Sequence, residues 1–73
     1  MSDLLLRFGL ALRRSRRAKG WSQERLAEMA DLNRSYLGEI ERGEKTPSLV
    51  TLAKLAAALE LSPAGLLARC ERR

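Results

Sequence analysis

One face of the segment 34–42 is polar and basic. Its members, which recur at helical spacing, are Arg34, Ser35, Gly38, Glu39 and Arg42. Leu37 and Ile40, three residues apart, point to the opposite face. A guanidinium and a hydroxyl supply positive charge and hydrogen bonds, which is the chemistry of binding an anionic partner. One face of this helix therefore serves a core, and the other is free to bind something else.

The elements that position this face are two short helices around a tight turn. The preceding segment, 23–30, has Leu26, Ala27 and Ala30 on one face, and Ser22 is placed to cap it. In the turn, Asp31 tolerates a left-handed conformation and Asn33 is a preferred N-cap. The pattern is typical of a DNA-reading helix-turn-helix. From this segment alone, an ordinary helix pair in a small bundle stays open as the alternative.

The size and charge of the chain limit the class of protein. Its 73 residues allow a single domain, residues 1–73, and dimerisation is expected to add stability to so small a core. Lysine and arginine number 14 against 9 acidic residues, a formal charge of +5, which favours nucleic acid over a membrane as partner. No apolar run approaches the roughly 20 residues of a membrane span. The single cysteine fits a reducing cytoplasm.

Groups for catalysis and metal binding are largely missing. The sequence has no histidine, one cysteine and no glycine-rich loop that cradles a phosphate. Most carboxylates lie three or four positions from a lysine or arginine, as on solvated helix faces. We therefore expect no enzyme activity, no metal and no cofactor. Without a separate effector domain, we also expect no small-molecule ligand.

Helical periodicity covers nearly the whole chain. Helices are predicted over residues 3–19, 23–30, 34–41 and 49–59, and a fifth opens with Ser62 and Pro63. No segment alternates as a strand does. The predicted fold class is all-α, a compact five-helix domain.

Several side chains outside the turn allow specific expectations. The first helix is expected to bury Leu5, Phe8 and Leu12, with Leu6 as a further candidate for the same face. Its six cations form either a solvated face or a source of phosphate attraction. Trp21 is expected to fill the junction of the first two helices rather than to stack on bases. Cys70 is expected to be a tolerated thiol on a frayed tail.

The chain resembles the Xre/Cro-type helix-turn-helix family of phage repressors and small bacterial regulators. The matching residues are Gly9, Leu12, Arg13, Arg16, Gly20, Ser22, Gln23, Leu26, Ala27, Ile40, Glu41, Gly43, Pro47, Ser48, Leu49, Leu52, Leu55, Ala56, Leu59, Ser62 and Pro63. The D-L-L-L-R-F-G start and the N-R-S-Y-L segment also resemble the controller proteins of restriction–modification systems. The resemblance implies a phage-repressor-like fold. It also implies a transcriptional regulator that binds a palindromic double-stranded DNA operator as a homodimer.

The resemblance further implies roles for individual residues. Base edges in the major groove are expected to face Arg34, Ser35 and Glu39. The DNA backbone is expected to contact Gln23, Asn33, Tyr36, Arg42, Lys45 and Thr46. Arg16 and Glu41 match the positions of a structural ion pair that ties the first helix to the end of the third.

Two positions, Asp31 and Glu39, depart from the expected pattern, and Gly38 is unusual inside a helix. Asp31 stands where the family often has glycine, at some conformational cost. Glu39 is acidic and faces a polyanion, so it either accepts from a cytosine amino group or only orients Arg34 or Arg42. Gly38 costs about 1 kcal/mol inside a helix. It is either merely tolerated or leaves a bare patch that lets the helix approach the groove.

The fifth helix is the candidate for self-association. Leu66 and Leu67 are adjacent and point about 100° apart, so both need not face one core. We expect Leu67 to join Pro63 and Ala64 in a two-fold dimer interface. A protein-interaction module on the same fold, such as an antitoxin or anti-regulator, is the alternative function. The polar and basic reading face favours DNA, because a protein-binding groove is expected to be apolar or aromatic.

Overall fold

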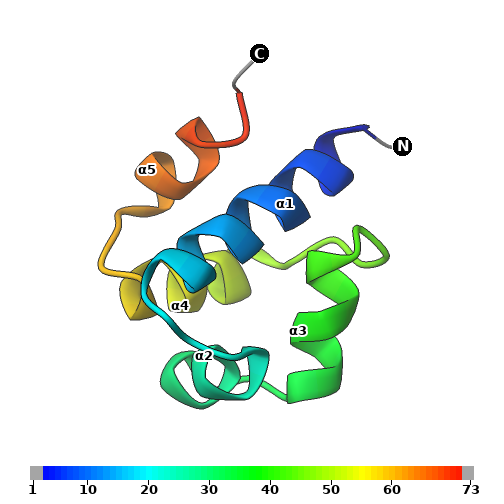
Figure 1. The fold of residues 1–73 in the computed structure, drawn as a ribbon. Coiled ribbons are helices and arrows are strands. Elements are labelled where there is room, and N and C mark those ends of the chain that lie inside the picture. The colour runs from blue at the N-terminus through cyan, green and yellow to red at the C-terminus, as the bar shows by residue number, and fades with distance from the viewer. Residues whose placement is uncertain (1–2, 72–73) are drawn as a thin grey trace.

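The computed structural model describes residues 3–71, which form five helices (Figure 1). These are α1 (Asp3–Ala18), α2 (Gln23–Ala30), α3 (Arg34–Glu41), α4 (Leu49–Ala58) and α5 (Pro63–Ala68). No strand occurs between residues 3 and 71, so the predicted all-α class is confirmed. The predicted bounds differ only at two C-terminal ends. Helices α1 and α4 each end one residue earlier than predicted.

Short polar side chains begin four of the helices. Ser22, Ser48 and Ser62 each accept, through Oγ, the backbone N–H of the residue three positions further on, at 2.9 to 3.0 Å. Asn33 caps α3 in a related way. Each of these bonds satisfies an N–H group that has no partner inside its helix. The helix starts are therefore encoded locally, as the sequence predicts.

Four of the helices end in the same kind of turn. The residue that ends each turn has left-handed backbone, at Gly20, Asp31, Gly43 and Glu60. The next N–H then donates to the carbonyl five positions earlier, as from Leu32 to Ala27 at 2.8 Å. The left-handed conformation predicted for Asp31 is confirmed, with φ of 58°. Glu60 adopts it too, which the sequence analysis did not anticipate.

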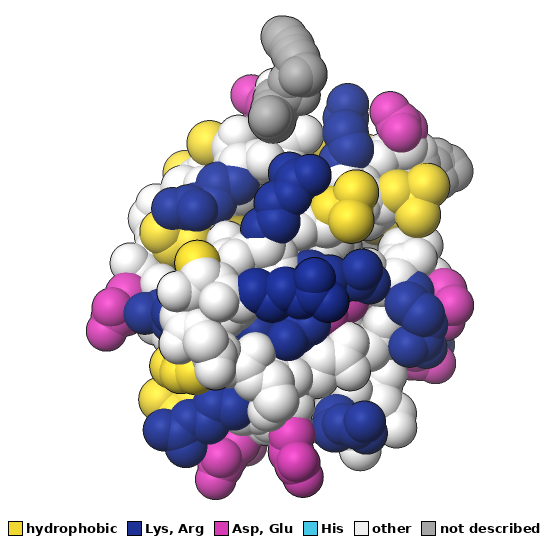
Figure 2. Space-filling view, in the orientation of Figure 1, with side chains coloured by type: hydrophobic (Ala, Val, Ile, Leu, Met, Phe, Trp, Pro, Cys, Tyr) yellow, Lys and Arg dark blue, Asp and Glu magenta, His cyan; other side chains and the backbone are white. Residues whose placement is uncertain are grey.

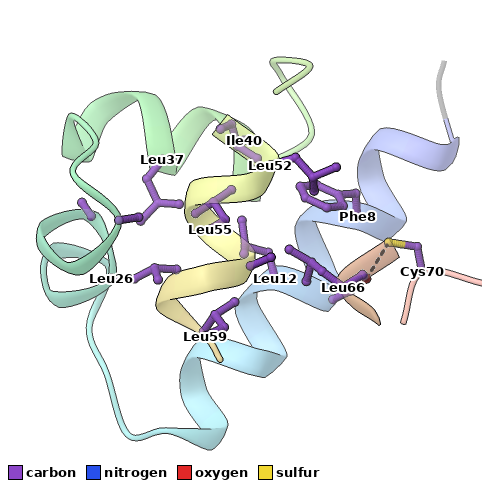
Figure 3. Close-up of a cluster of buried hydrophobic side chains, with 14 residues drawn as sticks. Phe8, Leu12, Leu26, Leu37, Ile40, Leu52, Leu55, Leu59, Leu66 and Cys70 are labelled. Carbon is purple, nitrogen blue, oxygen red and sulfur yellow. Dashed lines mark hydrogen bonds between the residues drawn. The ribbon is translucent and has the colours of Figure 1, made fainter. Parts of the chain in front are cut away.

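The core lies where the five helices converge (Figure 3). Each contributes one leucine with no exposed surface, namely Leu12, Leu26, Leu37, Leu55 and Leu66. Helix α1 packs on α3 and α5, α2 packs on α3 and α4, and α4 packs on α5. Because every helix buries one stripe, burial of apolar area is shared across the whole chain.

The crossing of α1 and α3 depends on Gly9. A Cβ atom at this position would lie 2.3 Å from the backbone oxygen of Glu41 and 2.8 Å from that of Ile40. These atoms belong to the backbone of α3 and cannot rotate away. Glycine therefore permits a helix approach that any side chain would prevent.

Two expectations about burial are wrong. Leu6 is 53% exposed, because the buried stripe of α1 passes through Phe8 and Leu12 and leaves Leu6 at its rim, against Gly43. Cys70 is 3% exposed and belongs to the core rather than to a frayed tail. Its Sγ lies 3.7 Å from the carbonyl oxygen of Leu66, and burial raises the pKa of the thiol.

Candidate nucleic-acid interface

The first turn of α3 presents polar groups to solvent. Arg34 and Ser35 are exposed there. Asn33 fixes the turn, because its Oδ1 accepts the backbone N–H of Ser35 at 2.8 Å and that of Tyr36 at 3.3 Å. With this oxygen engaged, the Asn33 side-chain amide is left with N–H donors for an external acceptor. The positive end of the α3 dipole adds to the attraction for an anion at this turn.

Two further residues of α3 expected to face DNA are only partly exposed. Tyr36 packs against the core with part of its ring, and Glu39 is half-buried. Within residues 3–71, no hydrogen bond or ion pair joins Glu39 to Arg34 or Arg42. The charge of Glu39 still raises the pKa of Arg42, although less than the contact with Glu44 does. A contact of Glu39 with a base therefore stays a prediction.

Arg42 pairs with Glu44, a partner that the sequence analysis missed. Its Nε donates to Oε2 of Glu44 at 3.0 Å and its Nη2 to Oε1 at 3.2 Å. The two side chains are 53% and 55% exposed. Hydrogen bonding and charge from Glu44 raise the pKa of Arg42, and the bond from Arg42 lowers the pKa of the Glu44 carboxyl. Both groups are therefore charged near neutral pH.

Gly38 is buried rather than bare. A Cβ atom there would lie 3.1 Å from Nη1 of Arg42 and 3.7 Å from Oε1 of Gln23. The side chains of Arg42 and Gln23 thus cover the glycine, which corrects the expectation of an open patch. The missing side chain leaves room for these two side chains over the outer face of α3.

A buried carboxylate joins this surface to the core. Glu41 has no exposed side-chain area and accepts two bonds from Arg16, at 2.8 Å from Nε and 3.0 Å from Nη2. Nη1 of Arg16 also donates to the carbonyl of Trp21 at 2.9 Å. The ion pair implied by the resemblance is therefore present. It connects α1, α3 and the junction before α2.

The same carboxylate positions Gln23. Nε2 of Gln23 donates to Oε1 of Glu41 at 2.9 Å, and Nε of Arg13 lies 3.8 Å from that oxygen. Gln23 is the first residue of α2, where backbone N–H groups and the helix dipole favour an anion. One N–H of the Gln23 amide is used internally. The other N–H and the backbone N–H groups at the start of α2 remain as donors for an external acceptor.

The remaining predicted backbone contacts, Lys45 and Thr46, lie exposed in the segment between α3 and α4. They follow directly on the Arg42–Glu44 pair and continue the same polar surface along the chain. The structure thus joins Gln23 to Glu41 by a hydrogen bond and places Gln23 and Arg42 over Gly38. Arg34, Ser35, Lys45 and Thr46 lie on the adjoining exposed positions.

The cations of α1 divide into two sets. Arg16 is buried and Arg13 half-buried beside Glu41, whereas Arg7, Arg14 and Arg17 are exposed. Figure 2 shows Lys and Arg side chains across the face formed by α1 and toward α3, with acidic side chains mainly at its rim. Helix α1 therefore supplies structural cations and a positive surface.

Trp21 occupies the junction between α1 and α2 and packs partly against the core. Nζ of Lys19 lies 5.3 Å from the ring centroid, and Cζ of Arg25 lies 5.9 Å from it. These are cation–π distances. The junction position agrees with the sequence-based expectation, and cations already cover the ring.

The predicted dimer residues lie on the surface of α5. Pro63 and Ala64 are exposed and Leu67 is 44% exposed, whereas Leu66 is fully buried. The divergence of Leu66 and Leu67 is as predicted. At the start of α4, Leu49 and Val50 are 83% and 67% exposed. Apolar surface at α5 is thus available for a partner.

Among residues 3–71, no three or more Cys, Asp or Glu side chains are grouped so that they would hold a metal ion. None of the helices described is long and apolar enough to cross a membrane.

Two residues of this surface escaped the sequence analysis as site residues. Arg13 matched the family pattern, but only the fold brings it beside Glu41 and Gln23. Glu44 carried one signal, its position two residues after Arg42 in a glycine-containing turn. That spacing is not a helical pair, so the pattern of i,i+4 charges did not reveal it.

Comparison with known proteins identifies relatives over nearly the whole chain. The family described as Helix-turn-helix matches residues 12–66. The control protein C.MunI of Mycoplasma sp. is 38% identical over 73 residues, which are 99% of this chain and 99% of that protein. The chain spans only 34% of another relative, the HTH-type transcriptional regulator SutR of Escherichia coli, with 38% identity.

Solved structures give the same picture. The restriction–modification controller protein C.AhdI from Aeromonas hydrophila has a TM-score of 0.83 and 52% identity, with 85% of this chain and 94% of that chain covered. The controller protein C.Esp1396I, solved as a tetramer with its natural 35 base-pair operator, has a TM-score of 0.84 and 28% identity. That comparison covers 99% of this chain and all of the other.

Proposed function

This chain belongs to the helix-turn-helix family of Xre/Cro-type DNA-binding transcriptional regulators, and we propose that it reads DNA by inserting α3 into the major groove. The observation that carries the proposal is the polar first turn of α3. Arg34 and Ser35 are exposed there, and Asn33 holds the backbone beneath them through two hydrogen bonds.

In this proposal, the residues of α3 contact bases. The Arg34 guanidinium donates to O6 and N7 of a guanine, and the Ser35 hydroxyl donates or accepts at a neighbouring base. Glu39 accepts from a cytosine amino group at the next turn of the helix. Tyr36 and Asn33 contact the DNA backbone from the same turn. The base contacts of Arg34, Ser35 and Glu39 supply the specificity.

The remaining contacts bind phosphates. Gln23 offers an amide N–H and the N-terminus of α2, and Arg42 offers a guanidinium at the end of α3. Lys45 and Thr46 extend the contact along the following loop. Such contacts fix the register of α3 on the duplex but carry no sequence information themselves.

We further propose that two copies bind a palindromic operator. The partly exposed Leu67, with Pro63 and Ala64, forms the two-fold interface. Two reading helices then meet half-sites roughly 34 Å apart, one turn of DNA. The operator-bound tetramer of C.Esp1396I supports assembly on DNA as the working form of such a protein.

We also propose that the protein is cytoplasmic and has no enzyme activity. The family is one of DNA-binding regulators rather than an enzyme class. The net charge of +5 and the single cysteine are in keeping with a nucleic-acid partner in a reducing compartment. The alternative of a protein-binding module gains nothing from the structure, because the outer face of α3 is polar.

Alanine substitution of Arg34 and of Lys45 tests the base-reading assignment. An operator sequence is first obtained by selecting bound sequences from a random DNA pool. Arg34→Ala is expected to weaken binding to this operator by about 1 to 3 kcal/mol and to leave binding to random DNA nearly unchanged. Lys45→Ala is expected to weaken both, because a phosphate contact is independent of sequence. Titrations with both DNAs measure the effects. The assignment would be contradicted if both variants lost affinity for the operator and for random DNA in the same ratio.

The dimer interface is tested by Leu67→Asp, with Leu10→Asp as its control. Both leucines are 44% exposed, on α5 and α1 respectively. Sedimentation should find the Leu67→Asp variant monomeric and still helical, whereas the Leu10→Asp variant remains dimeric. A Leu67→Asp variant that still sediments as a dimer would show that the interface lies elsewhere.

A further inference from the structure

We infer that the Glu44 carboxylate competes with a DNA phosphate for Arg42, and that this competition limits the affinity and the salt dependence of DNA binding. The inference rests on the proposed function, in which Arg42 contacts the DNA backbone. Glu44 thus opposes DNA binding, whereas the other residues assigned to this surface favour it.

The geometry of the pair carries this inference. Nε and Nη2 of Arg42 donate to the two carboxylate oxygens of Glu44 at 3.0 and 3.2 Å. An arginine binds two phosphate oxygens through the same fork of parallel N–H groups. The carboxylate of Glu44 therefore occupies the donors that a phosphate would use.

The rest of the guanidinium is held against α3. Nη1 lies 3.1 Å from the point where a Gly38 side chain would begin, so this nitrogen faces the helix. The edge formed by Nε and Nη2 is the edge bound to Glu44. A phosphate must either displace this carboxylate or bind beside it through the remaining N–H groups of Nη1 and Nη2.

Exposure determines which pairs can exchange partners. Arg42 and Glu44 are each about half exposed, at 53% and 55%. Such a pair contributes little to stability, because water and salt screen it and two side chains lose freedom in forming it. DNA can therefore replace Glu44 without unfolding the region. Glu44 nevertheless remains ionised, since its contact with Arg42 lowers the pKa of its carboxyl.

The charge of Glu44 offsets that of Arg42, so the pair attracts a phosphate less than an unpaired guanidinium does. Water and salt screen an exposed pair, so the gain from freeing Arg42 is modest. Removing the charge of Glu44 is therefore expected to strengthen binding by up to about fivefold per half-site. Because the phosphate contact is independent of sequence, the operator and random DNA are expected to gain equally.

The experiment compares Glu44→Gln with Glu28→Gln. Both substitutions remove one negative charge, and Glu28 is an exposed residue of α2 whose carboxylate lies 3.4 Å from Arg25. Binding to the operator and to random DNA is measured over a salt series. We expect Glu44→Gln to raise affinity for both DNAs and to steepen the log–log salt slope by about one per subunit. Glu28→Gln is expected to have a much smaller effect on each quantity.

A second pair of variants shows whether Glu44 acts through Arg42. In an Arg42→Ala background, Glu44→Gln is expected to change affinity no more than Glu28→Gln does. Equal gains from both charge removals in the wild-type background would overturn the inference, as would a Glu44→Gln variant that binds more weakly. A wild type that binds no DNA would instead contradict the proposed function, so the two failures are distinct.

Discussion

The protein contains two arginine–glutamate pairs at the end of α3 that are alike in geometry and opposite in environment. Arg16 and Glu41 form two bonds at 2.8 and 3.0 Å, and Arg42 and Glu44 form two at 3.0 and 3.2 Å. The side chains of the first pair are 9% and 0% exposed, whereas those of the second are about half exposed. Glu41 and Arg42 are neighbours in the sequence.

The difference teaches that burial, rather than bond length, decides what such a pair does. A buried charge that loses its partner cannot be solvated by water, so the first pair is fixed once the protein has folded. An exposed charge that loses its partner is solvated at once, so the second pair can exchange one anion for another. The first pair therefore suits structure and the second suits binding.

The largest effect is expected from breaking the buried pair. Glu41→Ala leaves the buried Arg16 without its carboxylate and removes the acceptor of Gln23. Removing one member of a buried pair costs about 3 to 5 kcal/mol, so the free energy of unfolding should fall by about that amount in chemical denaturation. Arg16→Met combined with Glu41→Leu should recover much of the loss. Wild-type stability in Glu41→Ala would mean that the pair has no structural role.

The same substitution, glycine to alanine, can be made beside each of the two pairs. Gly9→Ala introduces a Cβ atom 2.3 Å from the Glu41 backbone oxygen, next to the buried pair. Because overpacking of this kind is destabilising, the free energy of unfolding of Gly9→Ala should fall by about 1 to 3 kcal/mol.

Gly38→Ala introduces a Cβ atom against Nη1 of Arg42, which belongs to a flexible side chain and can move. Since alanine is the better helix former, the free energy of unfolding of this variant should rise by up to about 1 kcal/mol. Thermal melts of the two variants test the contrast. Shifts of the same sign would contradict it.

The smallest effect is expected from the exposed pair. The pKa of Glu44 is lowered in the folded protein from its ordinary value of 4.5, so its ionised form adds stability above that pH. The contribution is lost as the pH falls through the lowered pKa. Wild type should therefore exceed Glu44→Gln in melting temperature by a small amount near pH 7 and equal it in stronger acid. A difference that grows on acidification would contradict this sign.

Most of the fold was predictable because its signals are local. Ser22, Ser48 and Ser62 begin helices, and Asp31 ends one, through bonds that reach only a few residues. The spacing of leucines likewise depends only on the helical repeat. The two errors in burial concern Leu6 and Cys70, near the ends of the chain. There the packing depends on which helices lie alongside, and periodicity does not report that.

For the candidate site, the exposure of several residues was predictable, but their contacts were not. The exposed positions of Arg34, Ser35, Lys45 and Thr46 agree with the pattern. Family resemblance was needed to pair Arg16 with Glu41, since 25 residues separate them. The Arg42–Glu44 bond and the cover over Gly38 arise where a turn and the start of α2 meet α3. Such meetings are set by tertiary packing, so the sequence alone did not reveal them.

Helix α1 touches both α3 and α5, the helices proposed for reading DNA and for pairing subunits. Helix α1 holds these two helices at a fixed separation, since its 16 residues extend about 24 Å and a packed helix does not stretch. The separation of two reading helices in the proposed dimer is then set before DNA arrives. An operator whose half-sites are misplaced must bend or twist to fit, and bends of 40 to 90° cost about 1 to 6 kcal/mol. The elasticity of DNA, rather than that of the protein, would then decide which half-site spacings are accepted.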